Sequence, residues 1–257
     1  MSDHLRKSVA VVNQKGGVGK TTTAINLSSG LALAGKRVLL IDMDPQAHST
    51  VGLGFEPGSY DKALDDVLAQ SVAMEEAILK TQVQNLFLTP SRIHLDRTEH
   101  ELSTALFRES LIAKAIGGLD YDFIVIDCRP TLGTLTINAI YAATFIIVPC
   151  EMSRYSLDGF ADLMETIDAI KGRNVKKQEF VRILLTKFDA RNRVSNDWVM
   201  AQLENGYKDF LFGTRIRKNE ALNQAHMAME PIFNFKADSP GAEDYAQLTK
   251  EFLSLCQ

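Results

Sequence analysis

The chain has 257 residues, of which 46% are hydrophobic and 23% are charged, and this composition is ordinary for a globular protein with a large buried core. No apolar run approaches the roughly 20 residues that a membrane-spanning helix needs. The polar first seven residues also lack the pattern of a signal peptide, so we expect a cytoplasmic protein. The three cysteines, Cys128, Cys150 and Cys256, are widely spaced, which argues against a structural metal site or an iron–sulfur cluster within one chain.

Apolar runs alternate with helical patterns along most of the chain, as in a parallel sheet flanked by helices. We expect strands at residues 8–12, 37–41, 85–89, 123–127, 145–148 and 180–186. We expect helices at residues 20–34, 63–69, 105–116, 132–142, 157–170, 196–204 and 242–255. Several strands are apolar at consecutive positions, which is typical of strands covered on both faces. The sequence therefore predicts an α/β fold with a doubly wound, mostly parallel sheet, in a single domain over residues 1–257.

The segment after the first expected strand has the composition of a phosphate-binding loop. It reads Asn13-Gln14-Lys15-Gly16-Gly17-Val18-Gly19-Lys20-Thr21-Thr22. Its glycines let the backbone wrap around anionic oxygens, and the helix that follows adds its positive N-terminal end. Lys20 is expected to bridge the β- and γ-phosphates, and the Thr21 hydroxyl to complete a Mg²⁺ shell. Gln14 replaces the usual first glycine, and Lys15 has no role in the ordinary scheme.

Two of the expected strands end in acidic residues. Asp42 and Asp44 follow the second strand, and Asp127 ends the run at 123–127. Ligands of an open α/β sheet bind beyond the carboxyl ends of the strands, where a carboxylate can hold Mg²⁺ directly or through a water. The alternative is that these residues cap helices or form turns. The phosphate loop upstream favours a Mg²⁺–nucleotide site.

Taken together, these three motifs make the chain similar to the deviant Walker ATPases of the ParA/MinD class, and most similar to the ParA/Soj partition ATPases. Segments at 148–150, 184–189 and 214–225 also resemble family blocks in family order. The resemblance implies a P-loop ATPase with weak intrinsic activity that uses ATP and Mg²⁺ and forms a homodimer on ATP binding. It further implies nucleoid association through non-specific double-stranded DNA, a ParB-like adaptor that stimulates hydrolysis, and a role in chromosome or plasmid partitioning.

The resemblance also assigns roles to individual residues. Lys15 would cross the dimer interface and contact the phosphates bound by the partner, in the manner of an arginine finger. Asp44 would position or activate the attacking water, and Asp42 and Asp127 would serve the Mg²⁺ shell. The expected catalytic residues are Lys15, Lys20 and Asp44.

Two residues near these acids are open to more than one interpretation. Arg129 occupies the place of a proline that the family commonly has after the Walker B aspartate, whereas Pro130 is kept. Arg129 is either a solvated or interface arginine or a contact to the nucleotide or to DNA. Gln46 fits a turn after Pro45 as well as it fits a catalytic role.

Basic residues are concentrated in one part of a chain whose net charge is −4. Between residues 171 and 218, twelve Lys or Arg stand against five Asp or Glu, which predicts a positive surface. Such clusters bind DNA phosphates in a salt-sensitive manner, and the alternative is an ordinary solvated face. One group lies around a helix end and comprises Lys171, Arg173, Lys176 and Lys177. The candidate DNA contacts are Arg191, Arg193, Arg215, Arg217 and Lys218.

Other functions of the same site are open. By the resemblance, Arg217 or Asn219 could instead face the nucleotide base. The chain could be a positioning ATPase for a protein assembly, with the nucleoid or a membrane as its track, although residues 242–253 are acidic to neutral and favour a packed core helix. It could also be a metabolic P-loop ligase or synthetase, against which Lys15 argues. No helix-turn-helix pattern precedes the first strand, so operator recognition is not expected.

Overall fold

The computed structural model of the protein describes residues 7–152, 160–172 and 180–256. These residues form one eight-stranded sheet with the order β3-β4-β2-β5-β1-β6-β7-β8. β3 is antiparallel to β4, and the remaining neighbours pair in parallel. The strands are β1 (Lys7–Val11), β2 (Val38–Met43), β3 (Leu79–Lys80), β4 (Leu86–Thr89), β5 (Phe123–Cys128), β6 (Phe145–Glu151), β7 (Val181–Phe188) and β8 (Leu211–Arg217).

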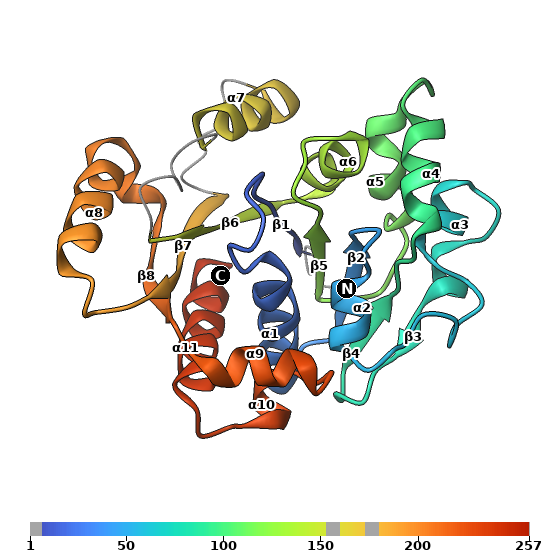
Figure 1. Ribbon diagram of the computed structural model, residues 1–257. Coiled ribbons are helices and arrows are strands. Elements are labelled where there is room, and N and C mark those ends of the chain that lie inside the picture. Colours follow the sequence, from blue (N-terminus) through green and yellow to red (C-terminus); the bar gives the residue numbers. More distant parts are fainter. Residues whose placement is uncertain (1–6, 153–159, 173–179, 257) are drawn as a thin grey trace.

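Helices cover both faces of this sheet (Figure 1). The group formed by α1, α9, α10 and α11 packs on one face, and the group from α3 to α8 packs on the other. The α-helices are α1 (Lys20–Leu33), α2 (His48–Gly52), α3 (Leu64–Leu68), α4 (His94–Leu102), α5 (Leu111–Ala115), α6 (Thr134–Ala142), α7 (Phe160–Lys171), α8 (Arg193–Tyr207), α9 (Glu220–Met227), α10 (Ile232–Phe235) and α11 (Pro240–Leu255). The expected doubly wound α/β fold is confirmed.

The central strands are buried along their whole length. Every residue of β2 and of β5 is buried, because alternate side chains enter two separate cores. Leu39 and Ile41 belong to the core on the α3–α8 side, whereas Val38 and Leu40 belong to the core on the α1 side. A strand covered on both faces needs consecutive apolar residues, and this explains the continuous hydrophobic runs in the sequence.

The six expected strands are all present, with ends shifted by up to three residues. The sequence prediction missed β8, whose side chains alternate between buried and exposed and whose exposed positions are occupied partly by arginine. It also missed the short strand β3 and the helices α2, α4, α9 and α10. The helix expected at 105–116 is wrong in its first half, because Phe107 has a left-handed φ of 58° and α5 begins only at Leu111. The start of the helix expected at 157–170 lies outside the described residues.

The C-terminal helix α11 packs into the core, as expected. Its N-terminus is capped by the Ser239 hydroxyl, which accepts the Ala242 N–H, and its Tyr245, Leu248 and Phe252 side chains are buried. The Phe252 ring lies 5.1 Å from the Phe145 ring, centroid to centroid. Within the described residues, no helix is both long enough and apolar enough to traverse a bilayer.

Close packing of α1 against α11 depends on Gly30. A Cβ added at this position would lie 2.2 Å from Thr249 Oγ1 and 3.2 Å from Thr249 Cβ, well inside van der Waals contact. The two helices therefore approach more closely than a larger residue allows, and this approach fixes α1 over the sheet.

We expect Gly30→Val to lower the free energy of unfolding by at least ~2 kcal/mol, because the added methyl groups have no room between α1 and α11. For a chain of this size the loss corresponds to a decrease in Tm of roughly 4–8 °C, measurable by thermal denaturation. Combining the change with Thr249→Ala should recover part of the loss. An unchanged Tm for Gly30→Val would contradict the packing.

Candidate nucleotide-binding site

The loop between β1 and α1 is tied to neighbouring strands. The Asn13 side chain donates to Pro149 O (2.7 Å) and accepts the Lys15 N–H (2.9 Å), which fastens the start of the loop to β6. The Thr186 hydroxyl donates to Val18 O (2.8 Å), which fastens its middle to β7. The backbone of the loop is therefore held in place by contacts that leave Gly16 and Gly17 exposed.

Two glycines give this loop its shape. Gly17 and Gly19 have φ angles of 72° and 90°, in the left-handed region that favours glycine. A Cβ on Gly16 or Gly17 would meet no atom within 4 Å, so the open side of the loop faces a space rather than a neighbouring element. Gly19 is also the N-cap residue of α1, and α1 therefore directs its positive end into that space.

Lys20 occupies the inside of the loop. Its side chain is only 7% exposed and its Nζ donates to Lys15 O at 2.9 Å. Burial lowers the pKa of Lys20, and the nearby Asp127 opposes this change. A phosphate oxygen offers this ammonium a stronger, charged acceptor than a carbonyl, so the geometry fits the expected phosphate role of Lys20.

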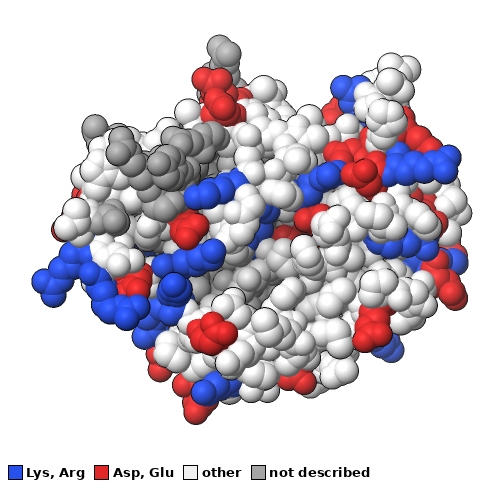
Figure 2. Space-filling view, in the orientation of Figure 1, with Lys and Arg blue, Asp and Glu red and all other residues white. Residues whose placement is uncertain are grey.

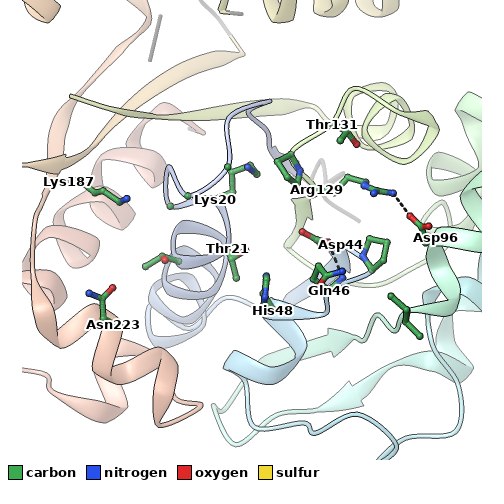
Figure 3. A pocket seen from close by; sticks show the side chains of 17 residues that line it. Lys20, Thr21, Asp44, Gln46, His48, Asp96, Arg129, Thr131, Lys187 and Asn223 are labelled. Atoms are coloured by element: carbon green, nitrogen blue, oxygen red, sulfur yellow. Dashed lines mark hydrogen bonds and ion pairs between the residues drawn. The ribbon is translucent and has the colours of Figure 1, made fainter. Parts of the chain in front are cut away.

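The loop borders a cavity of about 660 Å³, a volume typical of small-molecule sites. Figure 3 shows that side chains from several elements converge on it. Its lining includes Lys20, Thr21, Asp44, Arg129 and Lys187. Gly16, Gly17, Gly19 and Thr22 of the loop also contribute, whereas Val18 is buried with 0% exposure.

Sheet pairing places the acidic residues beside the loop. β5 lies between β1 and β2, with Asp127 in register with Val11 on one side and with Asp42 on the other. The carboxyl ends of these three strands therefore meet at one edge, as the sequence analysis expected. Asp42 and Asp127 are both fully buried.

Asp127 fits a Mg²⁺ site, and Thr21 lines the cavity beside it. Asp127 Oδ2 accepts the Ser49 hydroxyl at 2.7 Å, whereas Asp127 Oδ1 is buried with no hydrogen-bond partner among the described residues. A carboxylate oxygen left over in this way is suited to a Mg²⁺-bound water. The described residues contain no group of three or more His, Cys, Asp or Glu side chains that could hold a metal by themselves, so nucleotide phosphates and waters would have to supply the remaining ligands.

Asp42 has different contacts from those expected of a Mg²⁺ ligand. Its Oδ2 accepts both the Thr50 N–H (2.8 Å) and the Thr50 hydroxyl (2.7 Å), and its Oδ1 accepts the Asp44 N–H (3.1 Å). Both oxygens therefore accept hydrogen bonds from within the chain. Asp42 organises the turn between β2 and α2 and so places Asp44 at the cavity.

Asp44 reaches the cavity, and Gln46 supports its position. Asp44 is half-buried and lines the cavity, where its Oδ1 accepts the Gln46 N–H at 3.0 Å. Asp44 O also accepts the N–H of Ala47, a non-glycine residue with a φ of 55°. These contacts form a tight turn that holds the Asp44 carboxylate beside the phosphate loop (Figure 3).

Comparison with known proteins agrees with this geometry. A family model described as an AAA domain matches residues 6–181. The chain is 37% identical over 247 residues to the sporulation initiation inhibitor protein Soj of Bacillus subtilis (strain 168), covering 95% of this chain and 97% of that protein. It is 34% identical over 258 residues to the chromosome partitioning protein ParA of Caulobacter vibrioides (strain NA1000 / CB15N), covering 99% and 96%. The chain belongs to the ParA/Soj family of P-loop ATPases.

A solved structure with the same fold comes from an enzyme of different name. Cobyrinic acid a,c-diamide synthase from Mycobacterium smegmatis, with a bound ATP analogue and magnesium, is similar with a TM-score of 0.82 at 30% identity, covering 97% of this chain and 95% of that one. The ParA/Soj-family chain therefore shares its fold with a protein that is named as a synthase, so the fold alone does not assign the function.

Lys15 of this ParA/Soj-family chain lies outside the phosphate cradle. Its Nζ is 3.8 Å from Glu151 Oε2, and its side chain is 33% exposed. Lys20 points into the loop, whereas Lys15 does not line the cavity. The two lysines therefore lie on different sides of the loop, and of the two only Lys20 lines the cavity.

Arg129 lines the cavity and forms ion pairs with α4. Its Nη1 donates to Asp96 Oδ1 at 3.0 Å and to Glu99 Oε2, and Figure 3 shows its guanidinium directed toward Asp96 and away from Lys20. Glu99 Oε1 accepts the Leu135 N–H (3.0 Å) in the first turn of α6. Arg129 therefore links the segment after Asp127 to α4.

Two of the expected basic residues are held by partners within the chain. Arg217 forms ion pairs with Glu243 (2.8 Å) and Asp244 (2.7 Å) of α11, so its guanidinium anchors β8 to α11. Lys171 Nζ donates to Tyr141 O and Ala143 O at the end of α6. Arg173, Lys176 and Lys177 lie outside the described residues.

The remaining basic residues are at the surface. Lys and Arg side chains gather on the lower left flank of the molecule, around β8 and the lower end of α8 (Figure 2). Arg193, Arg215 and Lys218 are exposed. Arg191 is also exposed, and pairs with Asp189 at 2.7 Å. Asn219 Oδ1 caps α9, whereas its Nδ2 is buried with no hydrogen-bond partner among the described residues, in a hollow next to the cavity.

Several residues of the site were not found from the sequence. Ser49 and Thr50 hold the acidic residues, Thr186 holds the loop, and Glu99 holds Arg129. Ser49 and Thr50 follow the acidic motif within a few residues. Hydroxyl side chains so close to the acids could have been recognised from the sequence as hydrogen-bond donors to them. Thr186 and Glu99 contact residues far away in the sequence, so no local pattern indicates them.

The two buried carboxyls give the chain a pH-dependent stability. Burial raises the pKa of Asp42 to about 7 and that of Asp127 to about 6, and the proximity of Asp127 adds to the change at Asp42. Between these values and the unfolded value of ~3.9, the folded chain binds more protons than the unfolded chain. Its stability therefore falls as the pH rises through this range.

We expect the nucleotide-free, Mg²⁺-free chain to lose ~2 kcal/mol of unfolding free energy per pH unit between about pH 5 and 7, as measured by urea denaturation. The Asp127→Asn variant should show a clearly smaller slope, because one of the two titrating groups is gone. A wild-type slope equal to that of Asp127→Asn would show that Asp127 does not titrate in this range.

Proposed function

We propose that this chain is a single-domain ATPase that forms a homodimer on binding ATP and Mg²⁺ and then binds double-stranded DNA without sequence preference. A ParB-like adaptor would stimulate its weak hydrolysis and so release it from DNA. The process would partition a chromosome or plasmid, with the protein associated with the nucleoid in the cytoplasm. Relatives named for sporulation control and chromosome partitioning support this role.

The observation that carries the proposal is the placement of two lysines at one phosphate loop. Lys20 is buried in the loop, and Lys15 lies at its rim beside Glu151. A cation at the rim is available to a nucleotide in a second subunit, where it would stabilise charge on the transferring phosphoryl group. Thr21 and Asp127 would hold Mg²⁺, which neutralises charge on the β- and γ-phosphates, and Asp44 would orient the attacking water.

The ATP dependence of the oligomeric state tests the proposal directly. With Mg²⁺–ATP the wild type and the Asp44→Ala variant should shift to dimers in light scattering, and the variant should remain dimeric because it does not hydrolyse ATP. Lys20→Ala should stay monomeric. Lys15→Ala should bind ATP but lose turnover by about 10³-fold or more, by analogy with removal of an arginine finger.

The same experiment separates the alternatives. If neither wild type nor Asp44→Ala dimerises or retards arbitrary duplex DNA with ATP, the partition function is wrong. ATP turnover that requires a small carboxylate would instead favour a synthetase, an alternative with which the similarity to cobyrinic acid a,c-diamide synthase agrees. Dimerisation without DNA retardation would favour a positioning ATPase with another track.

DNA binding is proposed to use the exposed cations on the flank formed by β8 and α8, namely Arg191, Arg193, Arg215 and Lys218. Arg215 and Lys218 lie at β8 and just after it, and neither forms an ion pair among the described residues. Arg217 is excluded from the test, because its loss would leave Asp244, with a side chain only 9% exposed, without its ion pair.

The double variant Arg215→Ala/Lys218→Ala should weaken binding to duplex DNA by at least ~10-fold at moderate salt and reduce the slope of log affinity against log salt by about 2. Its ATP-dependent dimerisation should be unchanged. Lys236→Ala, which removes an exposed cation at the end of α10, serves as the matched control. An unchanged salt slope in the double variant would identify the cluster as an ordinary solvated face.

A further inference from the structure

A third lysine lies at the nucleotide cavity on an unusual backbone. Lys187 is near the end of β7, at an irregularity in the pairing with β8, and its φ of 52° lies in the left-handed region that non-glycine residues rarely adopt. Strained residues and irregular strand pairing of this kind often serve to aim a side chain at a functional site. The preceding residue, Thr186, is the one whose hydroxyl holds the phosphate loop.

The position of Lys187 connects two hollows. It lines the cavity beside the phosphate loop and also the neighbouring hollow that contains Asn219 and Tyr245. Figure 3 shows its ammonium extending toward the loop that carries Lys20. A nucleotide could place its phosphates in the first hollow and its remaining part in the second. It would then lie beside the Lys187 ammonium.

Glu151 stands between Lys187 and Lys15. It is the last residue of β6, in register with Thr186 of β7. Its Oε1 lies 3.9 Å from Lys187 Nζ, and its Oε2 lies 3.8 Å from Lys15 Nζ. One carboxylate therefore serves two ammonium groups, each through a different oxygen.

These contacts are weak enough to exchange. The three side chains are 31–48% exposed, and ion pairs of such length and exposure contribute little. A nucleotide phosphate carries more charge than one carboxylate and offers shorter contacts. Binding of a nucleotide can therefore withdraw both lysines from Glu151.

We propose that Lys187 is an additional phosphate-binding residue of this site, and that Glu151 is a positioning residue that holds Lys187 and Lys15 in the nucleotide-free chain and releases them to the phosphates. Lys187 acts on the nucleotide of its own subunit, whereas Lys15 is turned toward that of a partner. This inference rests on the proposed nucleotide binding, but not on DNA binding or partitioning.

Binding of Mg²⁺–ADP to the full chain, measured by titration calorimetry, tests the inference, because with ADP the affinity reports binding within one subunit. Lys187→Met should weaken binding by about three- to tenfold, and Lys187→Arg should restore most of the affinity. Lys36→Met removes a lysine beyond the opposite end of α1 and should leave the affinity within twofold of wild type.

A double-mutant cycle tests the role of Glu151. Glu151→Gln should strengthen Mg²⁺–ADP binding by about two- to fivefold, because Lys187 no longer has to leave a carboxylate. The gain should vanish in the Lys187→Met background and persist in the Lys15→Met background, because only Lys187 contacts the nucleotide of its own subunit. An equal gain in all backgrounds would show that Glu151 acts only through its charge, which would overturn its positioning role.

The outcomes also separate this inference from the proposed function. If the folded wild type does not bind Mg²⁺–ADP or Mg²⁺–ATP, the proposed function itself is wrong. If the wild type binds and Lys187→Met binds equally well, while its melting curve matches that of the wild type, only the role of Lys187 is overturned.

Discussion

The site depends on the parallel pairing of β5 with β1 and β2. This pairing places Asp127 in register with Val11, just before the phosphate loop, and with Asp42 on the other side. Two buried carboxyls thus lie at adjacent strand ends, where burial raises the pKa of both and the proximity of Asp127 raises that of Asp42 further. The Lys20 ammonium and hydroxyl donors from α2 stabilise the ionised carboxylates. In the proposed nucleotide-bound state, Mg²⁺ would stabilise them further. The position of α1, the turn after β2 and the cavity between them all follow from this arrangement.

In the nucleotide-free chain, most charged groups around the cavity already have partners. Lys20 contacts a carbonyl of its own loop, Arg129 contacts Asp96 and Glu99, and Glu151 contacts two lysines. Such internal pairing avoids isolated charges in a partly buried site, where they would be costly. It also means that a bound nucleotide replaces existing partners of these charged groups, because few of the groups are unpaired before it binds. The weaker pairs at the rim are the ones that can exchange, whereas the Arg129 contacts, with Glu99 only 14% exposed, are more firmly held.

The basic region shows why a count of charges overstates a binding surface. Arg217 and Lys171 contribute to the local excess of positive charge, yet both hold elements of the fold together. Arginine has a long side chain with several donors, so it can reach carboxylates on a neighbouring helix as readily as phosphates in solution. The exposed cations that remain on the flank of β8 and α8 form a smaller surface than the sequence alone indicated.

The sequence by itself determined the phosphate loop, the strands that end in Asp42 and Asp127, and the alternating architecture. These features depend on local properties, namely glycine conformations, consecutive apolar residues and residue types within a few positions of each other. Only the tertiary structure decided that Asp42 accepts hydrogen bonds from Thr50, that Arg129 pairs with α4, and that Glu151 lies between Lys15 and Lys187. Most of those contacts join elements that are distant in the chain, and the order and register of the strands, not the local pattern, bring them together.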